Sequence, residues 1–500
     1  MTKTGADHVR SLRDGREVYV NGERVHDVTT HPAFRNAIAT VAALYDYQAD
    51  PANIERMTFT SPTTGERVSR GWQLPDSLEA LQSRRRALTE WAKLHYGFMG
   101  RSPDCIASGL SGMRMGYDIL AGIDRKRADA VRGYYEFARD NDHFVTYGVV
   151  NPQADRSKGA SEQGDEFHSV AVVDEDSEGI TVRGGKMLGT SAIMANEVFI
   201  GNVVPLREGE EKYAVAFCVP IEAKGLKIFS RKSYEQSATS AFDNPLSSRL
   251  DENDAVFWME DVKVPWERVF ATRDIKMSRD IFHATPAHTC HNYQSQIRLV
   301  VKLQFLLAVA RRIAEVNGVI AFPQVRETLG KLAAQATMVE GLLNAMETCG
   351  QPTADGTYYY PSRQYLYAAL CVTQTLYNAY VTDIRELAGG GLIMLPSSLE
   401  DFASPLIAPY IRKTQRSGIT DAEGRVKFFK LAWDALGSEF ASRHAQYEMF
   451  YVGATFVARG YMYNNYPWAA PAAMLDGALD GYGVDSELAK LGKSAADTAG

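Results

Sequence analysis

The sequence contains no long hydrophobic run. Its most apolar window, residues 299–310, is interrupted by Lys302 and Gln304, whereas a membrane-spanning helix needs ~18 or more apolar residues in succession. The amino-terminal residues also lack an apolar stretch behind a charged head, so we expect no signal peptide. Both absences argue against a membrane partner and favour a cytoplasmic protein.

Cysteine and basic charge are also scarce. The 5 cysteines are odd in number and widely spaced, which argues against a secreted scaffold held by disulfides. Lysine and arginine number 54 against 61 acidic residues, giving a net charge of −7. This weak acidity argues against a general nucleic-acid binder, whose affinity rests on clustered basic groups. We interpret the one basic run, residues 84–86, as the solvated face of a helix.

Several common fingerprints of catalytic and cofactor sites are missing. The sequence has no G-x-G-x-x-G after a strand, no H-E-x-x-H and no G-x-S-x-G, so it predicts no Rossmann dinucleotide site. The densest group of metal-ligand types is His283, His288, Cys290 and His291. Such a group is typical of a loop whose rings bond to backbone or water, of a metal site, or of a general base. Because no second Cys/His pair stands at ligand spacing, we predict no metal.

The periodicity predicts an α+β protein of about three domains. Asn21-Gly22 between two short apolar runs indicates a hairpin, and Asp76 followed by Glu79 marks the start of a helical region reaching about residue 141. We place domain limits at 1–150 (mainly helical), 151–277 (β) and 278–500 (helical bundle with a loosely packed tail). Strands are expected at 168–187, 197–204, 213–220 and 255–264, and helices at 296–317, 325–348, 362–388 and 425–459.

Six longer strings carry more specific information. They are FMGRSPD at 98–104, VNPQADRS at 150–157, FDNPLSSRLDEND at 242–254, VPWERV at 264–269, SLEDF at 398–402 and LGSEFASRH at 436–444. Together they resemble the 4-hydroxyphenylacetate 3-hydroxylase family, in the family's order and over most of the chain.

The resemblance implies an acyl-CoA dehydrogenase-like fold, with an N-terminal helical domain, a middle β-barrel or β-sandwich and a C-terminal helical bundle. It also implies the oxygenase component of a two-component monooxygenase. Such an enzyme takes FADH2 from a separate flavin reductase and O2 from solution, and it hydroxylates an aromatic ring through a C4a-hydroperoxyflavin. Members of the family form homo-oligomers, usually tetramers.

The resemblance further implies particular site residues. Arg101 would line the substrate pocket, where a fixed guanidinium suits an oxyanion. The glycine run before Ser398 resembles a place where the flavin meets a neighbouring subunit. The flavin itself would be bound by Tyr147, Gly148, Val149, Gln153, Ala154, Asp155, Arg156, Thr190, Ser191, Ser438, Phe440, Ala441 and Arg443.

Three pocket positions depart from the family pattern. Cys105 stands where a tyrosine is common, and Tyr147 and Gln294 stand where histidines are usual. The simplest interpretation is drift within the family. We favour a changed substrate, such as a larger phenol or a hydroxylated pyridine, in a pocket lined by these three residues and Arg101. We assign catalytic roles to Arg101, Tyr147 and Gln294.

A missing base has several substitutes in the sequence. His143, His288 or His291 could take the proton of a phenol. A ring whose hydroxyl has a low pKa needs no base, because it arrives already ionised.

Other enzyme classes remain alternatives at this stage. A 4-hydroxybutyryl-CoA dehydratase needs three cysteines and a histidine for its iron–sulfur cluster, and Cys105 is alone in its region. An acyl-CoA dehydrogenase would hold FAD tightly and use a carboxylate base. A non-catalytic flavin-binding relative is the third alternative.

Overall fold

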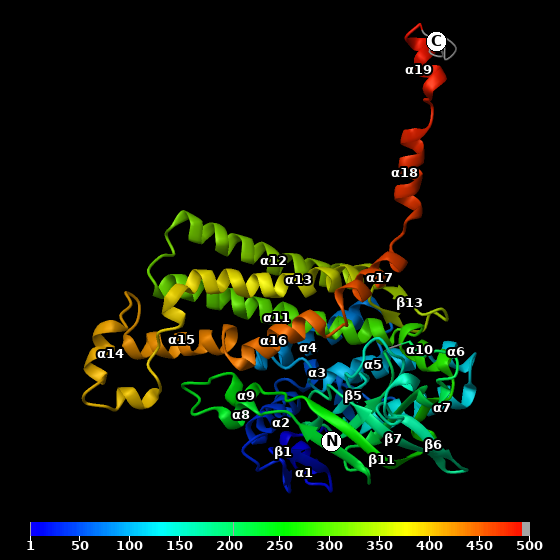
Figure 1. Cartoon of the computed structure of the whole chain (residues 1–500), viewed down its shortest axis with the longest axis horizontal. Coiled ribbons are helices and arrows are strands. Elements are labelled where there is room, and N and C mark those ends of the chain that lie inside the picture. Colours follow the sequence, from blue (N-terminus) through cyan, green and yellow to red (C-terminus); the bar gives the residue numbers. More distant parts are fainter. Residues whose placement is uncertain (1, 204, 493–500) are drawn as a thin grey trace.

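The computed structural model describes residues 2–203 and 205–492. Helices come first along the chain, two main sheets follow, and long helices form the C-terminal part (Figure 1). This confirms the predicted helix–sheet–helix order, while the domain limits at 150 and 277 stay predictions. No helix among the described residues is both long and apolar enough to cross a bilayer.

The predicted helical region from residue 76 to about 141 contains four α-helices, and three further α-helices precede it. Ser77, not Asp76, caps the helix that follows, because the Ser77 hydroxyl accepts a hydrogen bond from the backbone N–H of Ala80. A small hairpin, β3 (Thr58–Thr60) with β4 (Arg67–Ser69), interrupts these helices. The helices are α1 (Gly5–Ser11), α2 (Arg35–Ala49), α3 (Ile54–Met57), α4 (Leu78–Leu94), α5 (Asp104–Met115), α6 (Tyr117–Ala121) and α7 (Arg125–Asp140).

The basic run on α4 is only partly solvated, which corrects the sequence-based interpretation. Arg84 is buried, and its guanidinium donates hydrogen bonds to the carbonyl oxygen of Gly71 (2.8 Å) and to Ser108 Oγ (2.5 Å). Arg86 is exposed and Arg85 is half-buried. Successive residues of an α-helix are turned by about 100°, so three adjacent arginines cannot share one environment.

The predicted hairpin at Asn21-Gly22 is confirmed. It joins β1 (Glu17–Val20) to β2 (Glu23–Val25), and both turn residues have positive φ. β1 pairs with β10 in parallel, so this N-terminal hairpin becomes part of the six-stranded sheet β2-β1-β10-β11-β7-β6. The second main sheet has four strands in the order β12-β9-β8-β5.

Strands lie in all four predicted stretches of the middle region, but the stretch 168–187 is two strands, β6 and β7, separated by a turn. Three further strands, β5, β10 and β12, were not predicted. One predicted strand ends at Ile200, and Val204, its expected end, lies outside the described residues. The bounds are β5 (Val145–Gly148), β6 (Ala171–Glu175), β7 (Gly179–Lys186), β8 (Glu197–Ile200), β9 (Val215–Pro220), β10 (Leu226–Ser230), β11 (Ala255–Pro265) and β12 (Val269–Thr272). Two short helices, α8 (Tyr234–Ser237) and α9 (Ser247–Leu250), precede β11.

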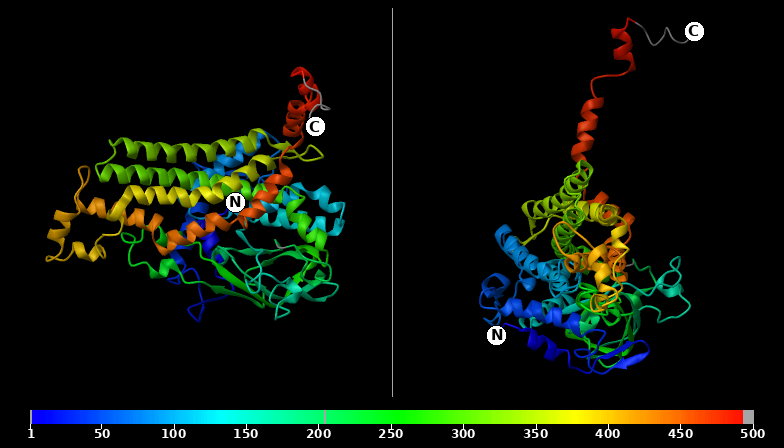
Figure 2. Two further views of the ribbon diagram at one scale, coloured as in Figure 1. Left: turned by 45° about the horizontal axis from the view of Figure 1, so that its top comes forward. Right: turned by 90° about the vertical axis from the view of Figure 1, so that its left-hand side faces the viewer.

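The C-terminal part contains three long helices that run side by side, α11, α12 and α13 (Figures 1 and 2). The expected single helix over 425–459 is wrong. It is three helices, because Gly437 ends the first, Ser438 caps the second and Gly453 adopts positive φ before the third. The helices are α10 (Ile275–His283), α11 (Ala287–Val316), α12 (Pro323–Thr348), α13 (Arg363–Ala388), α14 (Ala408–Thr414), α15 (Ala422–Leu436), α16 (Glu439–Phe450), α17 (Thr455–Asn465), α18 (Ala469–Leu479) and α19 (Val484–Lys490).

Two smaller features complete this part. A short pair of strands, β13 (Gln351–Pro352) and β14 (Tyr359–Tyr360), lies between α12 and α13. The helices α18 and α19 leave the body as an arm (Figure 2), and neither helix has a buried residue. The expected loose packing of the tail is confirmed as far as residue 492.

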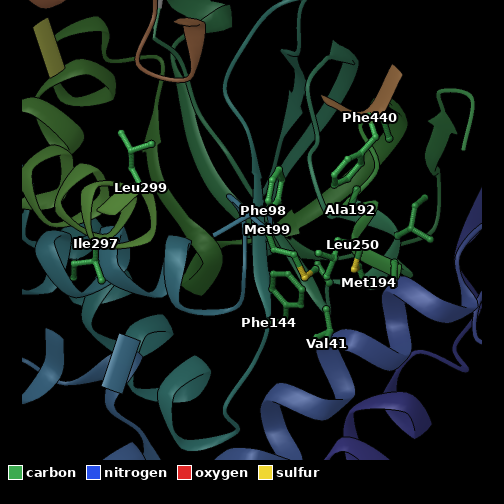
Figure 3. Packing of buried hydrophobic residues seen from close by; sticks show 14 of the residues in the cluster. Val41, Phe98, Met99, Phe144, Ala192, Met194, Leu250, Ile297, Leu299 and Phe440 are labelled. Carbon is green, nitrogen blue, oxygen red and sulfur yellow. The ribbon is translucent and has the colours of Figure 1, made fainter. Parts of the chain in front are cut away.

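One core joins the three parts of the chain. Phe98 and Phe144 from the N-terminal part pack with Ala192 from the sheet region and Phe440 from α16 (Figure 3). Burying a large apolar side chain contributes roughly 1.5–3 kcal/mol, so these contacts fix the helices and sheets relative to one another. The turn that carries Arg101 begins directly after Phe98 and Met99.

A buried charge cluster connects α11 to α16. Glu448 accepts hydrogen bonds from Arg298 Nη2 at 2.9 Å and Lys302 Nζ at 2.9 Å, and all three residues are at most 1% exposed. Burial alone raises the pKa of Glu448, but the two cations outweigh it and lower that pKa to about 2. One carboxylate thus serves as the ion-pair partner of both cations.

We therefore expect Glu448→Gln to lower the free energy of unfolding by about 3–5 kcal/mol, because it leaves two buried cations unpaired. Urea unfolding of the apoprotein measures this. The matched control is Glu315→Gln, which removes an ion pair to the exposed Arg311 on the same helix and should cost about 0–1 kcal/mol. Equal losses in the two variants would contradict the assignment.

Candidate active site

Arg101 lies in the turn between α4 and α5, in the string Gly100-Arg101-Ser102-Pro103. Its side chain is 2% exposed. A Cβ on Gly100 would overlap the hydroxyl of Tyr447 from α16, so only glycine allows the turn to approach that ring. The sequence thus brings the arginine against the C-terminal helices at a position where water is excluded.

Three of the predicted pocket residues meet at this point. Arg101 Nη2 donates a hydrogen bond to Tyr147 Oη at 2.5 Å, and Nη1 lies 3.6 Å from Cys105 Sγ. The guanidinium also lies over the rings of Tyr147 and Tyr447, at 5.0 and 5.3 Å from their centroids. The structure therefore places Arg101, Cys105 and Tyr147 in one cluster.

The partners of the Arg101 side chain are all neutral. Burial raises the pKa of the Cys105 thiol to about 11 and raises the pKa of the Tyr147 phenol. Within the described residues no carboxylate forms an ion pair with the Arg101 guanidinium. A buried guanidinium without an ion-pair partner favours an incoming anion, because the low local dielectric screens the attraction less than water does.

Gln294, the fourth predicted pocket residue, lies on α11 behind this cluster. Its amide nitrogen donates to Asp104 Oδ2 at 3.0 Å and lies 3.4 Å from Ser102 Oγ, both in the Arg101 turn. Its amide oxygen is buried and has no partner among the described residues. Gln294 thus supports the turn from α11 and makes no hydrogen bond to Arg101 or Tyr147.

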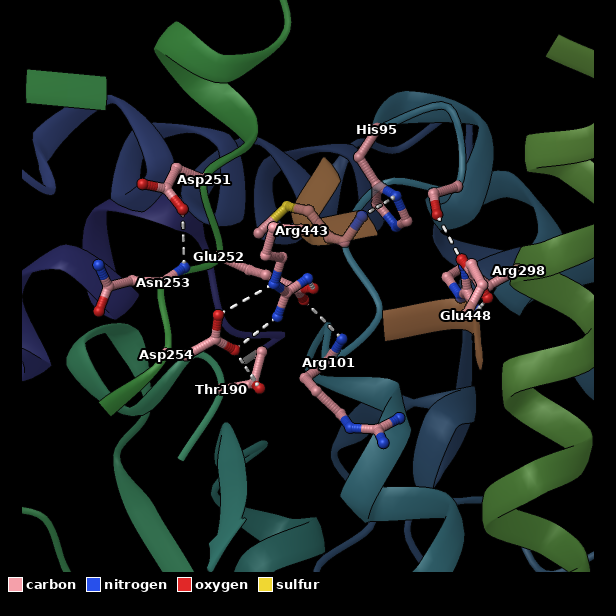
Figure 4. Close-up of polar contacts among 12 residues, drawn as sticks. His95, Arg101, Thr190, Asp251, Glu252, Asn253, Asp254, Arg298, Arg443 and Glu448 are labelled. Carbon is pink, nitrogen blue, oxygen red and sulfur yellow. Dashed lines mark hydrogen bonds and ion pairs between the residues drawn. The ribbon is translucent and has the colours of Figure 1, made fainter. Parts of the chain in front are cut away.

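A second cluster forms around the segment Asp251–Asp254 (Figure 4). Arg443 of α16 donates to Asp254 Oδ2 at 2.9 Å and to Glu252 Oε1 at 2.5 Å. The backbone N–H of Arg101 donates to the other oxygen of Glu252 at 2.8 Å. Burial raises the pKa of Asp254, but Arg443 and then Arg231 outweigh it and hold that pKa well below its ordinary value.

Thr190 and Ser191 join this second cluster. The Thr190 hydroxyl donates to Asp254 Oδ1 at 2.7 Å, and its carbonyl oxygen accepts from Thr146 of β5 at 2.6 Å. Ser191 adopts φ 65°, and its buried hydroxyl has no partner among the described residues. A strained residue with an unpaired buried hydroxyl is a feature of ligand sites.

The other predicted flavin residues fall into three groups. Ser438 caps α16, Ala441 donates its backbone N–H to Ser438 Oγ at 3.1 Å, and the Phe440 ring packs 5.5 Å from that of Phe98. Tyr147, Gly148 and Val149 lie in or directly after β5. The remaining four, Gln153, Ala154, Asp155 and Arg156, are exposed on the loop that follows, away from the Arg101 cluster.

Comparison with known proteins decides the family. Residues 4–271 match the family model described as 4-hydroxyphenylacetate 3-hydroxylase N terminal, and residues 278–480 match its C-terminal counterpart. The chain belongs to the 4-hydroxyphenylacetate 3-hydroxylase family. The resemblance inferred from the six strings is thereby confirmed.

Individual relatives are similar over nearly their whole length. The chain is 34% identical to the 4-hydroxyphenylacetate 3-monooxygenase oxygenase component of Geobacillus sp. (strain PA-9), over 90% of this chain and 91% of that one. It is 36% identical to the pyoverdin chromophore biosynthetic protein PvcC of Pseudomonas aeruginosa, over 90% and 89%. A crystal structure of an oxygenase component (HpaB) complexed with FAD aligns with a TM-score of 0.90 and 32% identity, covering 96% and 98%.

His291 is a candidate base whose place beside Tyr147 the sequence did not predict. The sequence left three histidines open as a base, and only His291 packs on Tyr147, edge to face at 5.6 Å. Burial, and then the charge of Arg101, hold the pKa of His291 well below its ordinary value, so the ring is neutral. Both ring nitrogens are buried and without partners among the described residues.

The other two histidines lie elsewhere. His143 stacks on Phe137, and His288 contacts Tyr367 of α13. Among the described residues, no group of three or more His, Cys, Asp or Glu is arranged to hold a metal.

Lys186 is a buried residue that the sequence did not single out. Its ammonium donates to the side-chain oxygens of Asn151, at 2.6 Å, and Asn202, at 2.8 Å. Burial lowers the pKa of Lys186 to about 7. Lys186 thus links the start of the exposed loop after β5 to the segment after β8. A single lysine in a strand with alternating polar and apolar residues gives no sequence signal for such a link.

Thiol labelling tests the neutral character of the Arg101 cluster. A buried thiol with a pKa of about 11 carries almost no thiolate, so Cys105 should resist iodoacetamide at pH 8 in the native chain. The exposed Cys349 should react within minutes and serves as the internal control. Peptide mapping by mass spectrometry follows both sites, and labelling of Cys105 as fast as Cys349 would contradict the description.

Proposed function

We propose that this chain is the oxygenase component of a two-component monooxygenase, which hydroxylates a phenolic or hydroxylated heteroaromatic ring with reduced FAD and O2. A separate flavin reductase would supply the FADH2. The observation that carries the proposal is the buried Arg101 guanidinium, which has no carboxylate ion-pair partner among the described residues and contacts Tyr147 and Cys105. The backbone N–H of Arg101 is held by Glu252, the carboxylate that also pairs with Arg443. Family membership over nearly the whole chain supports the same reaction class.

The residues of the second cluster fit a flavin. The orphaned hydroxyl of Ser191, the backbone beside Thr190 and the Arg443 guanidinium supply donors and acceptors for a polar ring edge. Bound reduced flavin would supply the activated oxygen. The protein's part is to exclude water from that oxygen and to hold the aromatic ring beside it.

Arg101 and His291 have complementary roles in this proposal. Arg101 binds the phenolic oxygen and favours its anionic form, which is the more reactive toward an electrophilic oxygen. The neutral ring of His291 has a free nitrogen that accepts the phenol proton. Tyr147, whose own hydroxyl contacts Arg101, marks the place of the substrate oxygen.

The substrate differs from 4-hydroxyphenylacetate in our proposal. Cys105 and Tyr147 replace groups usual in the phenylacetate hydroxylases, and both contact Arg101 directly. A larger phenol or a hydroxypyridine suits the altered pocket. Of the two relatives above, both at about 35% identity, one is named for 4-hydroxyphenylacetate and the other for the biosynthesis of the pyoverdin chromophore.

We also propose that the chain forms a homo-oligomer, as a tetramer. The supporting observation is the arm of α18 and α19, which carries Met474, Leu475 and Leu479 with more than half of each side chain exposed. Apolar side chains this exposed are usually covered in an assembly.

Reconstitution tests the function. Anaerobic titration should show tighter binding of reduced than of oxidised FAD. Mixing the complex with O2 should give a transient flavin absorbance band that free reduced FAD does not give. With a reductase, NADH, FAD and a panel of phenols and hydroxypyridines, at least one ring should be hydroxylated, and 4-hydroxyphenylacetate should be turned over poorly.

Two variants make this test specific. Arg101→Met should still bind reduced FAD but lose about 10²–10³-fold in hydroxylation, whereas Arg10→Met, at an exposed surface position, should change nothing. Brisk catechol formation from 4-hydroxyphenylacetate would overturn the substrate proposal. Tight binding of oxidised FAD, together with reduction of that FAD by an acyl-CoA, would identify a dehydrogenase instead. Failure to bind either oxidised or reduced FAD would identify a non-catalytic relative.

A further inference from the structure

A cavity of about 400 Å³ lies beside the Arg101 cluster, between α10, α13, α17 and the segment after β8. Its size is in the range of small-molecule sites. None of the residues discussed as contacts of Arg101 lines it. The polar and aromatic side chains around it are Asn202, Arg279, His283, Arg363, Tyr367, Tyr461, Asn464 and Asn465.

The cavity is electropositive. Two arginines line it, and no carboxylate is among the lining residues that the structure describes. Arg279 is already paired with Asp280, at 2.9 Å. His283 adds no charge, because burial lowers its pKa.

Arg363, the first residue of α13, is the uncompensated cation of this cavity. Its Nη2 donates to the carbonyl oxygens of Ala284 and Thr285, at 3.2 and 2.9 Å. These bonds fix the guanidinium without neutralising it. Its Nε is buried and has no partner among the described residues. A fixed guanidinium with a spare donor is well suited to a carboxylate or phosphate.

A row of packed aromatic and histidine rings extends from the Arg101 cluster to this cavity. The His291 ring, which packs on Tyr147, lies 5.9 Å from Phe282, and Phe282 lies 5.6 Å from His288. His288 in turn contacts two lining residues, Tyr461 at 5.3 Å and Tyr367 at 5.7 Å between ring centroids. The two sites therefore share one aromatic partition formed by α10 and the start of α11.

We propose that this cavity binds an anionic group at the end of an extended substituent of the aromatic substrate, with Arg363 as its anchor. The inference rests on the proposed function, since it places the reacting ring at Arg101. The substituent lies along the partition of Phe282 and His288, and the tyrosines supply apolar faces for its chain. A phenol with a short or uncharged substituent would leave Arg363 unpaired.

Direct binding measurements test this without turnover. The probes are ω-(4-hydroxyphenyl)alkanoic acids with two to eight carbons in the acid chain, together with their methyl esters. Calorimetry on the apoprotein should give an optimum chain length at which the acid binds about 10–100-fold more tightly than its ester, the value expected of a charge-assisted hydrogen bond. Esters should show no such optimum.

Variants assign that preference to Arg363. Arg363→Gln should bring the acid-to-ester ratio close to one, while Arg363→Lys should keep part of it. Arg326→Gln is the matched control, because Arg326 is an exposed arginine that also donates to a carbonyl oxygen, that of Ile320. General destabilisation by Arg363→Gln would weaken acid and ester alike and leave their ratio unchanged.

Three results would overturn the assignment. One is a ratio near one in the native chain, and another is an unchanged ratio in Arg363→Gln. The third is a loss of reduced FAD affinity in Arg363→Gln equal to any loss of acid affinity, since the anion would then be the cofactor's phosphate. If the chain hydroxylates no ring but still prefers acids in a manner that depends on Arg363, the proposed function is wrong and the anion site is retained.

Discussion

The carboxylates of Glu252 and Asp254 hold together the segments from which the site is built. Glu252 accepts from the backbone of Arg101 and from the Arg443 side chain, and Asp254 accepts from Arg443 and Thr190. The N-terminal turn, the sheet region and α16 thus meet at one short stretch before β11. Buried ion pairs contribute little net stability, so we interpret this set as a device that fixes the position of Arg101 relative to the predicted flavin residues.

The position of Arg101 matters because the groups that contact its guanidinium carry no charge. Tyr147 and Cys105, which contact its guanidinium, are neutral, and so is His291, which packs on Tyr147. Since no carboxylate among the described residues forms an ion pair with this guanidinium, its charge is available to a substrate oxygen. The same logic applies to Arg363 in the adjoining cavity, so the structure offers one cation for the ring oxygen and a second for a distant anionic group.

The sequence predicted the order of helices and sheets because periodicity reports which face of an element is buried. It failed where local signals compete. Gly437 and Ser438 broke an expected helix, and Arg84 was buried within a run expected to be solvated. The strings located Arg101 and Arg443, since each lies inside a motif, and Tyr147, which stands just before one. His291, Lys186 and Arg363 derive their importance from contacts between segments far apart in the chain, which neither spacing nor composition reveals.

In the proposed function, the Arg101 pocket binds the ionised form of a hydroxylated ring. The absorbance of bound 4-nitrophenol as a function of pH tests it most directly, because the phenol and the phenolate absorb at different wavelengths. Binding should lower the apparent pKa of the nitrophenol by about one unit or more, and Arg101→Met should remove that shift. A bound pKa equal to or above that of free nitrophenol would contradict the account.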